Sequence, residues 1–223
     1  MLQLEGVRVN IKAFVILRGV SLEVPAGRIV GLVGRNGAGK TTTLKSIMGL
    51  VPVRSGIIRL DGRDLVQTPA YKRARQGIGY VPEDRRLIGT LTVEENILLP
   101  AWAAGLNGHE ERLGRIYRLM PEVKELAGRR ATLLSGGQQK MVALARSLVS
   151  GTKLLLLDEP FEGLAPALSQ RLGGVIRTLQ EEGLAVLIAE SDLKLVSSLA
   201  QTIYTIERGE ILPEPPTGLE GVC

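Results

Sequence analysis

Residues 34–41 read Gly-Arg-Asn-Gly-Ala-Gly-Lys-Thr and match G-x-x-x-x-G-K-[ST], the pattern of a loop that binds nucleotide phosphates. An apolar, β-rich stretch precedes the loop at residues 28–33, and a stretch with helical spacing follows it at residues 42–48. Strand, glycine-rich loop and helix in this order are the context in which the motif holds phosphates. The sequence therefore predicts a nucleotide-binding site.

The residues of this loop have distinct physical roles. Gly34, Gly37 and Gly39 permit backbone conformations in which consecutive N–H groups point at phosphate oxygens, and the following helix adds its positive end. Lys40 is expected to reach the β- and γ-phosphates, and the Thr41 hydroxyl to bind Mg²⁺. We expect the phosphates to be held by one continuous run of residues: Gly34, Arg35, Asn36, Gly37, Ala38, Gly39, Lys40, Thr41 and Thr42.

Composition favours a globular α/β chain. With 223 residues, of which 44% are hydrophobic, the chain is long enough to bury a substantial core. Only 3% are aromatic, so the core must consist of Leu, Val, Ile and Ala, as in parallel α/β sheets. The net charge of +5 comes from basic residues scattered among acidic ones, without interleaved aromatics, which favours a solvated surface over a nucleic-acid partner.

Cysteine usage and hydropathy indicate the compartment. The one cysteine, Cys223, cannot form an internal disulfide, which is typical of a reducing cytoplasm. Neither a signal peptide nor an apolar run of about 18 residues is evident, so we expect any membrane association to be peripheral.

The rest of the chain alternates between predicted strands and helices. Residues 2–33 are expected to form short strands separated by turns, and residues 82–131 a more polar, helical region in which Thr92 caps a helix. Further strands are predicted at 55–62, 77–81, 154–157, 185–189 and 202–206, and further helices at 137–149, 166–181 and 193–200. This alternation predicts a parallel sheet covered by helices on both faces.

A second chemical motif follows the predicted strand 154–157, where Asp158 and Glu159 come after four leucines. Parallel sheets place functional groups at the carboxyl ends of their strands. Asp158 is expected to hold Mg²⁺, and Glu159 to polarise a water that attacks the γ-phosphate. Capping of a following helix is the alternative for Asp158, and the phosphate loop in the same chain disfavours it.

A third motif is Leu-Ser-Gly-Gly-Gln at residues 134–138. A turn and a helix cap would account for this run, but a Ser hydroxyl, glycine N–H groups and a positive helix end also make an anion cradle. One chain rarely needs two phosphate cradles for one nucleotide, so the second cradle requires an explanation of its own.

The three motifs, in this order and spacing, resemble the nucleotide-binding subunits of ATP-binding cassette (ABC) transporters over about residues 2–212. The resemblance implies an α/β P-loop NTPase fold: a RecA-like parallel sheet with helices on both faces, an N-terminal antiparallel β subdomain and an inserted α-helical subdomain. It implies a nucleotide-binding core at 2–82 and 132–212 and a helical subdomain at about 83–131. The proline-rich segment at 213–223 is expected to be a loose tail.

The resemblance also implies partners. Two ATPase subunits pair head to tail, so that ATP and Mg²⁺ lie between the phosphate loop of one chain and the LSGGQ motif of the other. The motif's contact residues would be Ser135, Gly136, Gly137 and Gln138, with Ser135 and Gly137 touching the γ-phosphate. The dimer would drive membrane permease subunits through a groove lined by residues around 82–100, from the cytoplasmic face of the inner or plasma membrane.

Three shorter strings narrow the resemblance: Tyr80–Arg86, Leu91–Ile97 and Gly163–Pro166 are similar to the ATPase subunits of branched-chain amino acid importers. Urea and amide importers share much of these strings. Such systems also use a solute-binding protein, and their ATPase subunits form homodimers or heterodimers; this chain is similar to the smaller type. The binding protein and permease choose the solute, and this sequence contains neither.

The sequence departs from the family pattern at several positions. Glu83 stands where most members have a Gln that contacts Mg²⁺ and the attacking water, and a carboxylate can still bind the metal. Ile11 stands at the position of an adenine-stacking aromatic residue; Phe14 lies three residues further on, and either stacks on adenine or packs in the core. Ala165 replaces a usual Asp, as in the importers.

Ser191 stands where the family usually has a histidine that contacts the γ-phosphate. The only histidine, His109, lies in the helical region and is expected on the solvated surface. Serine donates a hydrogen bond but brings no positive charge to the transition state. Either Glu159 suffices as the base and turnover is modest, or the chain binds ATP well and hydrolyses it slowly beside a more competent partner. An ATP-binding regulatory subunit with little activity is a further alternative.

Two functions from other classes fit less well. Cassette ATPases that act on DNA or ribosomes usually carry long coiled-coil insertions or two cassettes, for which 223 residues leave no room. A small-molecule P-loop kinase would have no use for the LSGGQ motif.

Overall fold

The computed structural model describes residues 1–213, and its centre is a six-stranded sheet in the order β10-β9-β3-β8-β7-β6. All neighbouring strands except β9 and β10 run parallel, as the alternation of strands and helices predicts. All but the first residue of the predicted tail, 213–223, lie outside the described residues. The strands are β3 (Ile29–Val33), β6 (Ile78–Val81), β7 (Leu154–Asp158), β8 (Ala185–Glu190), β9 (Thr202–Glu207) and β10 (Glu210–Ile211).

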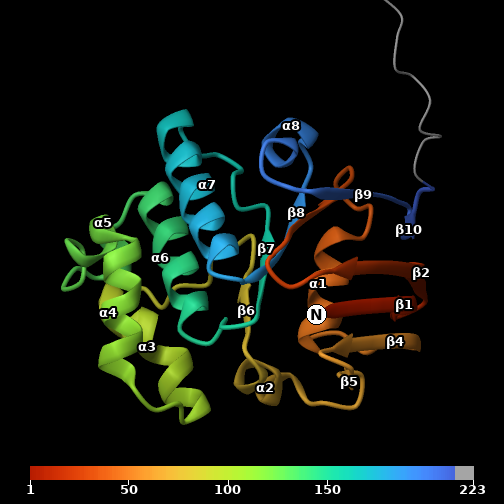
Figure 1. Cartoon of the computed structure of the whole chain (residues 1–223), viewed down its shortest axis with the longest axis horizontal. Helices are drawn as coiled ribbons and strands as arrows, with labels where there is room; N and C mark the ends of the chain where they lie inside the picture. The colour runs from red at the N-terminus through yellow and green to blue at the C-terminus, as the bar shows by residue number, and fades with distance from the viewer. Residues whose placement is uncertain (214–223) are drawn as a thin grey trace, which may run out of the picture.

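An antiparallel sheet in the order β2-β1-β4-β5 lies to one side of the central sheet (Figure 1). Its strands are β1 (Leu2–Ile11), β2 (Phe14–Val24), β4 (Ser55–Leu60) and β5 (Arg63–Asp64). β1 and β2 are 10 and 11 residues long, so residues 2–24 form one long hairpin where short strands were predicted. A tight turn at Lys12, whose φ is 53°, joins them.

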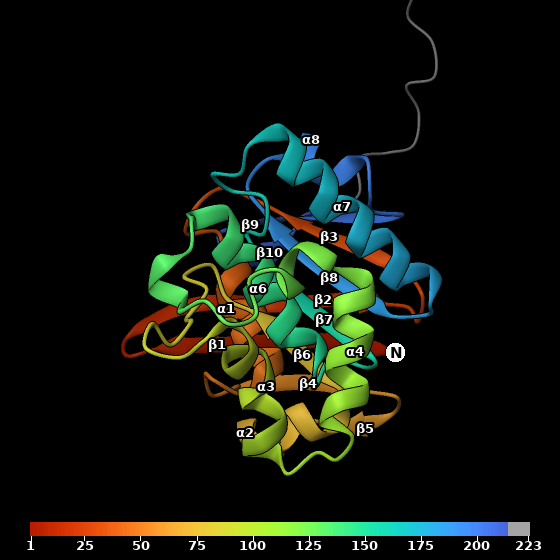
Figure 2. The ribbon, with the colours of Figure 1, turned by 90° about the vertical axis from the view of Figure 1, so that its left-hand side faces the viewer.

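Helices cover both faces of the central sheet (Figures 1 and 2). α1 (Lys40–Met48) lies between the two sheets, whereas α6 (Gly136–Leu148) and α7 (Pro166–Glu181) cover the other face. Beyond α6 lie α3 (Val93–Ala104), α4 (His109–Leu119) and α5 (Pro121–Lys124). Shorter helices are α2 (Ala70–Arg73), η1 (Ala74–Gln76), η2 (Ala131–Leu133) and α8 (Leu193–Ser197).

None of the helices within residues 1–213 combines the length and the apolar character needed to cross a bilayer.

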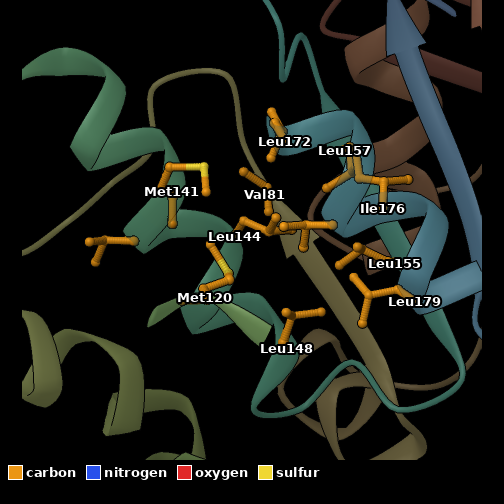
Figure 3. Close-up of a cluster of buried hydrophobic side chains, with 14 of the residues drawn as sticks. Val81, Met120, Met141, Leu144, Leu148, Leu155, Leu157, Leu172, Ile176 and Leu179 are labelled. Atoms are coloured by element: carbon orange, nitrogen blue, oxygen red, sulfur yellow. The ribbon is translucent and has the colours of Figure 1, made fainter. Parts of the chain in front are cut away.

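Strand β7 shows how the central sheet is buried on both faces. Leu154 and Leu156 pack into a core shared with β1, β2 and α1, whereas Leu155 and Leu157 pack into a second core with α6 and α7. The two pairs separate because successive side chains of a strand point to opposite faces. Figure 3 shows the second core, in which Leu144 of α6 reaches the sheet.

Local sequence signals set some of the helix ends. Thr92 caps α3 in a reciprocal capping box with Glu95, and α7 spans the predicted range 166–181. α8 ends at Ser197, three residues before its predicted end. The chain must turn there to enter β9, since the amide of Gln201 already donates to the carbonyl of Ile29.

Candidate active site

The phosphate loop connects β3 to α1, and its shape depends on glycine. Gly39 is the N-cap of α1 with a φ of 117°, in the left-handed region that favours glycine. At Gly34, an added Cβ would lie 2.3 Å from the carbonyl oxygen of Ile206, so a larger residue would push the loop away from β9. The loop therefore presents the N-terminal amides of α1 as the anion cradle that the sequence predicts.

Lys40 lies at the centre of the site, with only 5% of its side chain exposed. Its ammonium donates to the Gly34 carbonyl at 2.6 Å and to the Ser191 hydroxyl at 2.9 Å, and lies 3.0 Å from Glu159 Oε1. Ser191 Oγ is also 2.7 Å from Glu159 Oε1 and 2.9 Å from Asn36 Oδ1. The structure thus brings together three of the four residues predicted to act in catalysis.

Thr41 and Asp158, two of the predicted Mg²⁺ ligands, are in direct contact. Thr41 Oγ1 donates to Asp158 Oδ1 at 3.0 Å, and the Tyr80 hydroxyl donates to Asp158 Oδ2 at 3.3 Å. Burial raises the pKa of Asp158, and these two hydrogen bonds oppose that shift. Tyr80 was not predicted as a site residue; it reaches Asp158 because β6 pairs with β7.

The donor set suits Mg²⁺. Within residues 1–213, no group of three or more His, Cys, Asp or Glu side chains forms a metal cage. Magnesium keeps several waters and uses one or two carboxylates together with nucleotide phosphates. One hydroxyl and one carboxylate beside a phosphate cradle are therefore a sufficient protein contribution.

A cleft of about 480 Å³ opens in front of the phosphate loop. Glu83, the third predicted Mg²⁺ ligand, is exposed and lines this cleft from the loop after β6. Ile16 and Glu162 also line it, although neither was predicted from the sequence. The remaining lining residues belong to the predicted set: Asn36, Gly37, Gly39, Lys40, Thr41, Thr42 and Glu159. Arg35 and Ala38 instead border a more open depression beside Ser191.

Glu190, at the end of β8, is a buried carboxyl group that the sequence did not single out. It is 1% exposed, and its Oε1 accepts the Phe161 N–H at 2.9 Å. Burial and a hydrogen bond with Glu159 raise the pKa of Glu190 to about 8. Burial opposes the charge of Glu159, but hydrogen bonds with Glu190, Ser191 and Lys40 outweigh it and lower the pKa of Glu159. At neutral pH, Glu159 is therefore ionised while Glu190 holds a proton.

This proton makes the stability of the chain depend on pH. Between the ordinary pKa of 4.5 and the raised pKa of about 8, folded Glu190 keeps a proton that the unfolded chain releases, so its contribution to stability falls as pH rises across this range and is lost above about 8. Gln at position 190 has no proton to lose. We expect the free energy of unfolding of Glu190→Gln to rise relative to that of the wild type by about 4 kcal/mol between pH 5 and pH 9, as the ordinary and raised pKa values require.

Urea unfolding at pH 5, 7 and 9 measures this difference. The control is Glu181→Gln on the exposed end of α7. Its free energy of unfolding should change with pH in the same way as that of the wild type. The same pH dependence for Glu190→Gln as well would show that the carboxyl group carries no extra proton in the folded state.

The predicted second cradle, Ser135–Gln138, lies at the start of α6. Ser135 caps the helix: its hydroxyl accepts the Gln138 N–H at 3.3 Å, and its N–H donates to the Gln138 side chain at 3.0 Å. Ser135 and Gly136 are exposed, and among the described residues none of the four lines the cleft of the phosphate loop. Capping thus explains the serine, while the exposed Ser135 and Gly136 leave the motif accessible to another molecule.

The two adenine-stacking candidates lie at the tip of the β1–β2 hairpin, where Ile11 pairs with Phe14. Phe14 is 72% exposed, so core packing does not account for it, and it precedes the cleft residue Ile16 by two positions. Ile11 is 42% exposed. His109 is less exposed than predicted: it is half-buried at the start of α4 and, within residues 1–213, its Nε2 has no hydrogen-bond partner.

The fold and the site define a class of protein. A phosphate loop between β3 and α1, a hydroxyl–carboxylate pair suited to Mg²⁺ and a second carboxylate beside them form the pattern of a P-loop ATPase site, flanked here by an antiparallel sheet and a helical region. The chain belongs to the ABC transporter family, whose model matches residues 17–162.

Related transport ATPases and solved cassette structures resemble this chain over most of its length. The high-affinity branched-chain amino acid transport ATP-binding protein BraG of Pseudomonas aeruginosa is 40% identical over 196 residues, which cover 88% of this chain and 84% of BraG. The lipopolysaccharide export system ATP-binding protein LptB of Escherichia coli is 35% identical, with 88% and 83% covered. A dimeric bacterial ABC transporter cassette has a TM-score of 0.86 at 25% identity, with 96% and 97% covered. A dimeric post-hydrolysis cassette bound to ADP and Pi has a TM-score of 0.85 at 26% identity, with the same coverage.

Family membership establishes the general activity. The chain is an ATP-hydrolysing subunit of a transporter, and it uses ATP and Mg²⁺. The predicted P-loop NTPase fold is confirmed. ABC ATPase cassettes dimerise and work with membrane permease subunits.

Proposed function

We propose that this chain powers import of branched-chain amino acids, as a peripheral subunit on the cytoplasmic face of the membrane. The main support is the 40% identity to BraG over 84% of that protein. A permease and a solute-binding protein would complete the importer. The likeness to LptB supports a transporter ATPase equally well but belongs to an export system, so transport itself must decide the direction and the solute.

Within this proposal, two chains form two composite ATP sites. The phosphate loop of one chain, with Lys40, would hold the β- and γ-phosphates, and Ser135–Gln138 of the other would close over them. Thr41, Asp158 and Glu83 would bind Mg²⁺, whose charge neutralises the phosphate oxygens. The central sheet and antiparallel sheet would form the nucleotide-binding core, and residues 83–131 the helical subdomain that meets the permease.

The proposed chemistry rests on Glu159. Its carboxylate is ionised, lies beside Lys40 and faces the cleft, so it can take a proton from a water that attacks the γ-phosphate. Ser191 would donate a hydrogen bond to the transferred phosphoryl group without adding charge.

An uptake experiment tests the solute. We expect deletion of the gene for this chain to abolish high-affinity uptake of labelled leucine, isoleucine and valine in its host. The wild-type gene should restore uptake, and Lys40→Ala should not, because it removes the ammonium at the centre of the site. Unchanged uptake of all three amino acids, with loss of urea or amide uptake or of outer-membrane lipopolysaccharide, would replace the proposed solute by the one that is lost.

A further inference from the structure

Lys140 is a buried lysine on α6 that the proposed chemistry does not use. It is 7% exposed and lies five residues after Ser135 on the same helix. Its ammonium donates to the Glu159 carbonyl at 2.8 Å and to the Glu162 carbonyl at 2.5 Å. Burial lowers the pKa of Lys140, and the charges of Glu162 and Glu159 oppose this shift while that of Arg85 adds to it. A buried ammonium needs hydrogen-bond partners, and here both carbonyl partners come from one loop. Lys140 therefore links α6 specifically to that loop.

The loop that Lys140 contacts carries the proposed base in an unusual conformation. Glu159 has a φ of 48°, in the left-handed region that costs a non-glycine residue roughly 1–2 kcal/mol. The structure holds this residue from both sides: its N–H donates to the Ala189 carbonyl at 2.9 Å, and its carbonyl accepts from Lys140. Because the backbone direction at Glu159 sets where its side chain points, Lys140 helps to aim the carboxylate into the cleft.

The helix that carries Lys140 links two functional segments. Its first turn holds Ser135–Gln138, and a second basic residue further along, Arg146, donates to the carbonyls of Arg85 and Arg86 in the loop that follows Glu83. Leu144 packs the same helix against the central sheet (Figure 3). A movement of the start of α6 would therefore reach both the Glu159 loop and the Glu83 loop through direct contacts.

We propose that Lys140 is a positioning residue for ATP hydrolysis: it holds Glu159 in its active orientation and ties that orientation to α6. The inference rests on the proposed roles of Glu159 and of Ser135–Gln138. A nucleotide that engages Ser135–Gln138 on one chain would thereby act on the base of that same chain, which belongs to the other composite site.

The key variant is Lys140→Met, which keeps the length of the side chain and removes the ammonium. In the purified full chain we expect kcat for ATP hydrolysis to fall about 10- to 100-fold, the size of loss that misplacing a catalytic group produces. The KM for ATP should stay within about twofold, because Lys140 does not line the cleft of the phosphate loop. An ATP-stabilised dimer should also accumulate with this variant, since ATP binds but is consumed slowly.

Three further variants make the result specific. Lys140→Arg should recover most of the wild-type kcat, because a guanidinium can donate to both carbonyls. Lys124→Met, at an exposed lysine of α5, should behave as wild type. If Lys140→Met fails to fold, Lys140→Gln takes its place, with the same split between kcat and KM expected.

Wild-type kcat in a folded Lys140→Met or Lys140→Gln variant would overturn the inference, as would a loss of kcat without any ATP-stabilised dimer. Comparison with Glu159→Gln separates the role proposed for Lys140 from the role proposed for Glu159. If Glu159→Gln hydrolyses ATP at the wild-type rate, the role proposed for Glu159 fails. If Glu159→Gln is inactive while Lys140→Met or Lys140→Gln is fully active, only the role of Lys140 fails.

Discussion

Glu159→Gln lowers ATP hydrolysis by the purified chain about 10²- to 10⁴-fold, the contribution expected of a general base. The glutamine amide keeps the size of the side chain, but it has no carboxylate with which to accept a proton from water. The amide also ends the 3.0 Å ion pair with Lys40, so binding of ATP phosphates by Lys40 no longer competes with Glu159. ATP affinity should therefore be retained or increased.

Two measurements check this outcome: phosphate release at saturating ATP, and size-exclusion chromatography with ATP and Mg²⁺. Glu159→Gln should elute as an ATP-stabilised dimer, because closed sites that cannot hydrolyse do not reopen. Glu181→Gln, on the exposed end of α7, should match the wild type in both assays. If Glu159→Gln binds ATP but forms no dimer, the proposed pairing of the phosphate loop with Ser135–Gln138 is wrong.

The wild-type rate in the same assay decides between the two alternatives for Ser191. Its hydroxyl lies within hydrogen-bond distance of Lys40, Asn36 and Glu159, so it can orient groups around the phosphates. It cannot supply the positive charge of a protonated histidine. Modest but steady turnover that Glu159→Gln abolishes would show that the carboxylate suffices, whereas slow turnover would indicate a subunit that depends on a more competent partner for most of the hydrolysis.

The features that sequence alone predicted well are those encoded by neighbouring residues. The phosphate loop, the leucines of β7 and the capping box at Thr92 each have a local pattern, and the structure places them as predicted. Because successive side chains of a strand point to opposite faces, the four consecutive leucines of β7 also imply that both faces of the sheet are covered.

The residues that sequence missed reach the site through long-range pairing. Tyr80 meets Asp158 because β6 lies beside β7, and Glu190 meets Glu159 because β8 lies on the other side. Lys140 is a single charge that follows the polar first turn of α6, and only the packing of α6 buries it. A buried charged residue has no local sequence signature, because its partners come from distant elements.

Arg73 is another charged residue that partners from other elements bury, and we expect its substitution to have the largest effect on stability. It is 2% exposed and lies at the end of α2, where its guanidinium donates to Ser46 and Ile47 carbonyls at 2.9 and 2.5 Å. These carbonyls lie in the last turn of α1, where the Ser46 carbonyl also accepts the Gly49 N–H, whereas the Ile47 carbonyl has no backbone donor among the described residues. The guanidinium also donates to the Thr68 carbonyl at 2.8 Å, so it joins the helix of the phosphate loop to the segment leading into β6.

Arg73→Met keeps much of the apolar stem but removes the guanidinium donor from the Ser46, Ile47 and Thr68 carbonyls, of which, within residues 1–213, only the Ser46 carbonyl keeps a backbone donor, the Gly49 N–H. Each such group costs about 1–3 kcal/mol, and relief of the buried charge offsets part of the sum, so we expect a loss of about 3 kcal/mol. For a chain of this size that corresponds to a fall in Tm of about 6 to 12 °C. Arg75→Met, two residues away and exposed, should shift Tm by no more than about 2 °C.

Thermal unfolding with and without nucleotide shows whether Arg73→Met destabilises the fold alone or also disturbs the nucleotide site. Arg73 lies at the opposite end of α1 from Lys40 and does not line the cleft, so the variant should bind ATP with wild-type affinity. ATP at about 100 times its Kd should then stabilise Arg73→Met and wild type by the same amount, about 2.7 kcal/mol. A smaller gain for the variant would mean that Arg73 also shapes the phosphate loop, and an unchanged Tm without nucleotide would show that its carbonyl contacts contribute nothing to stability.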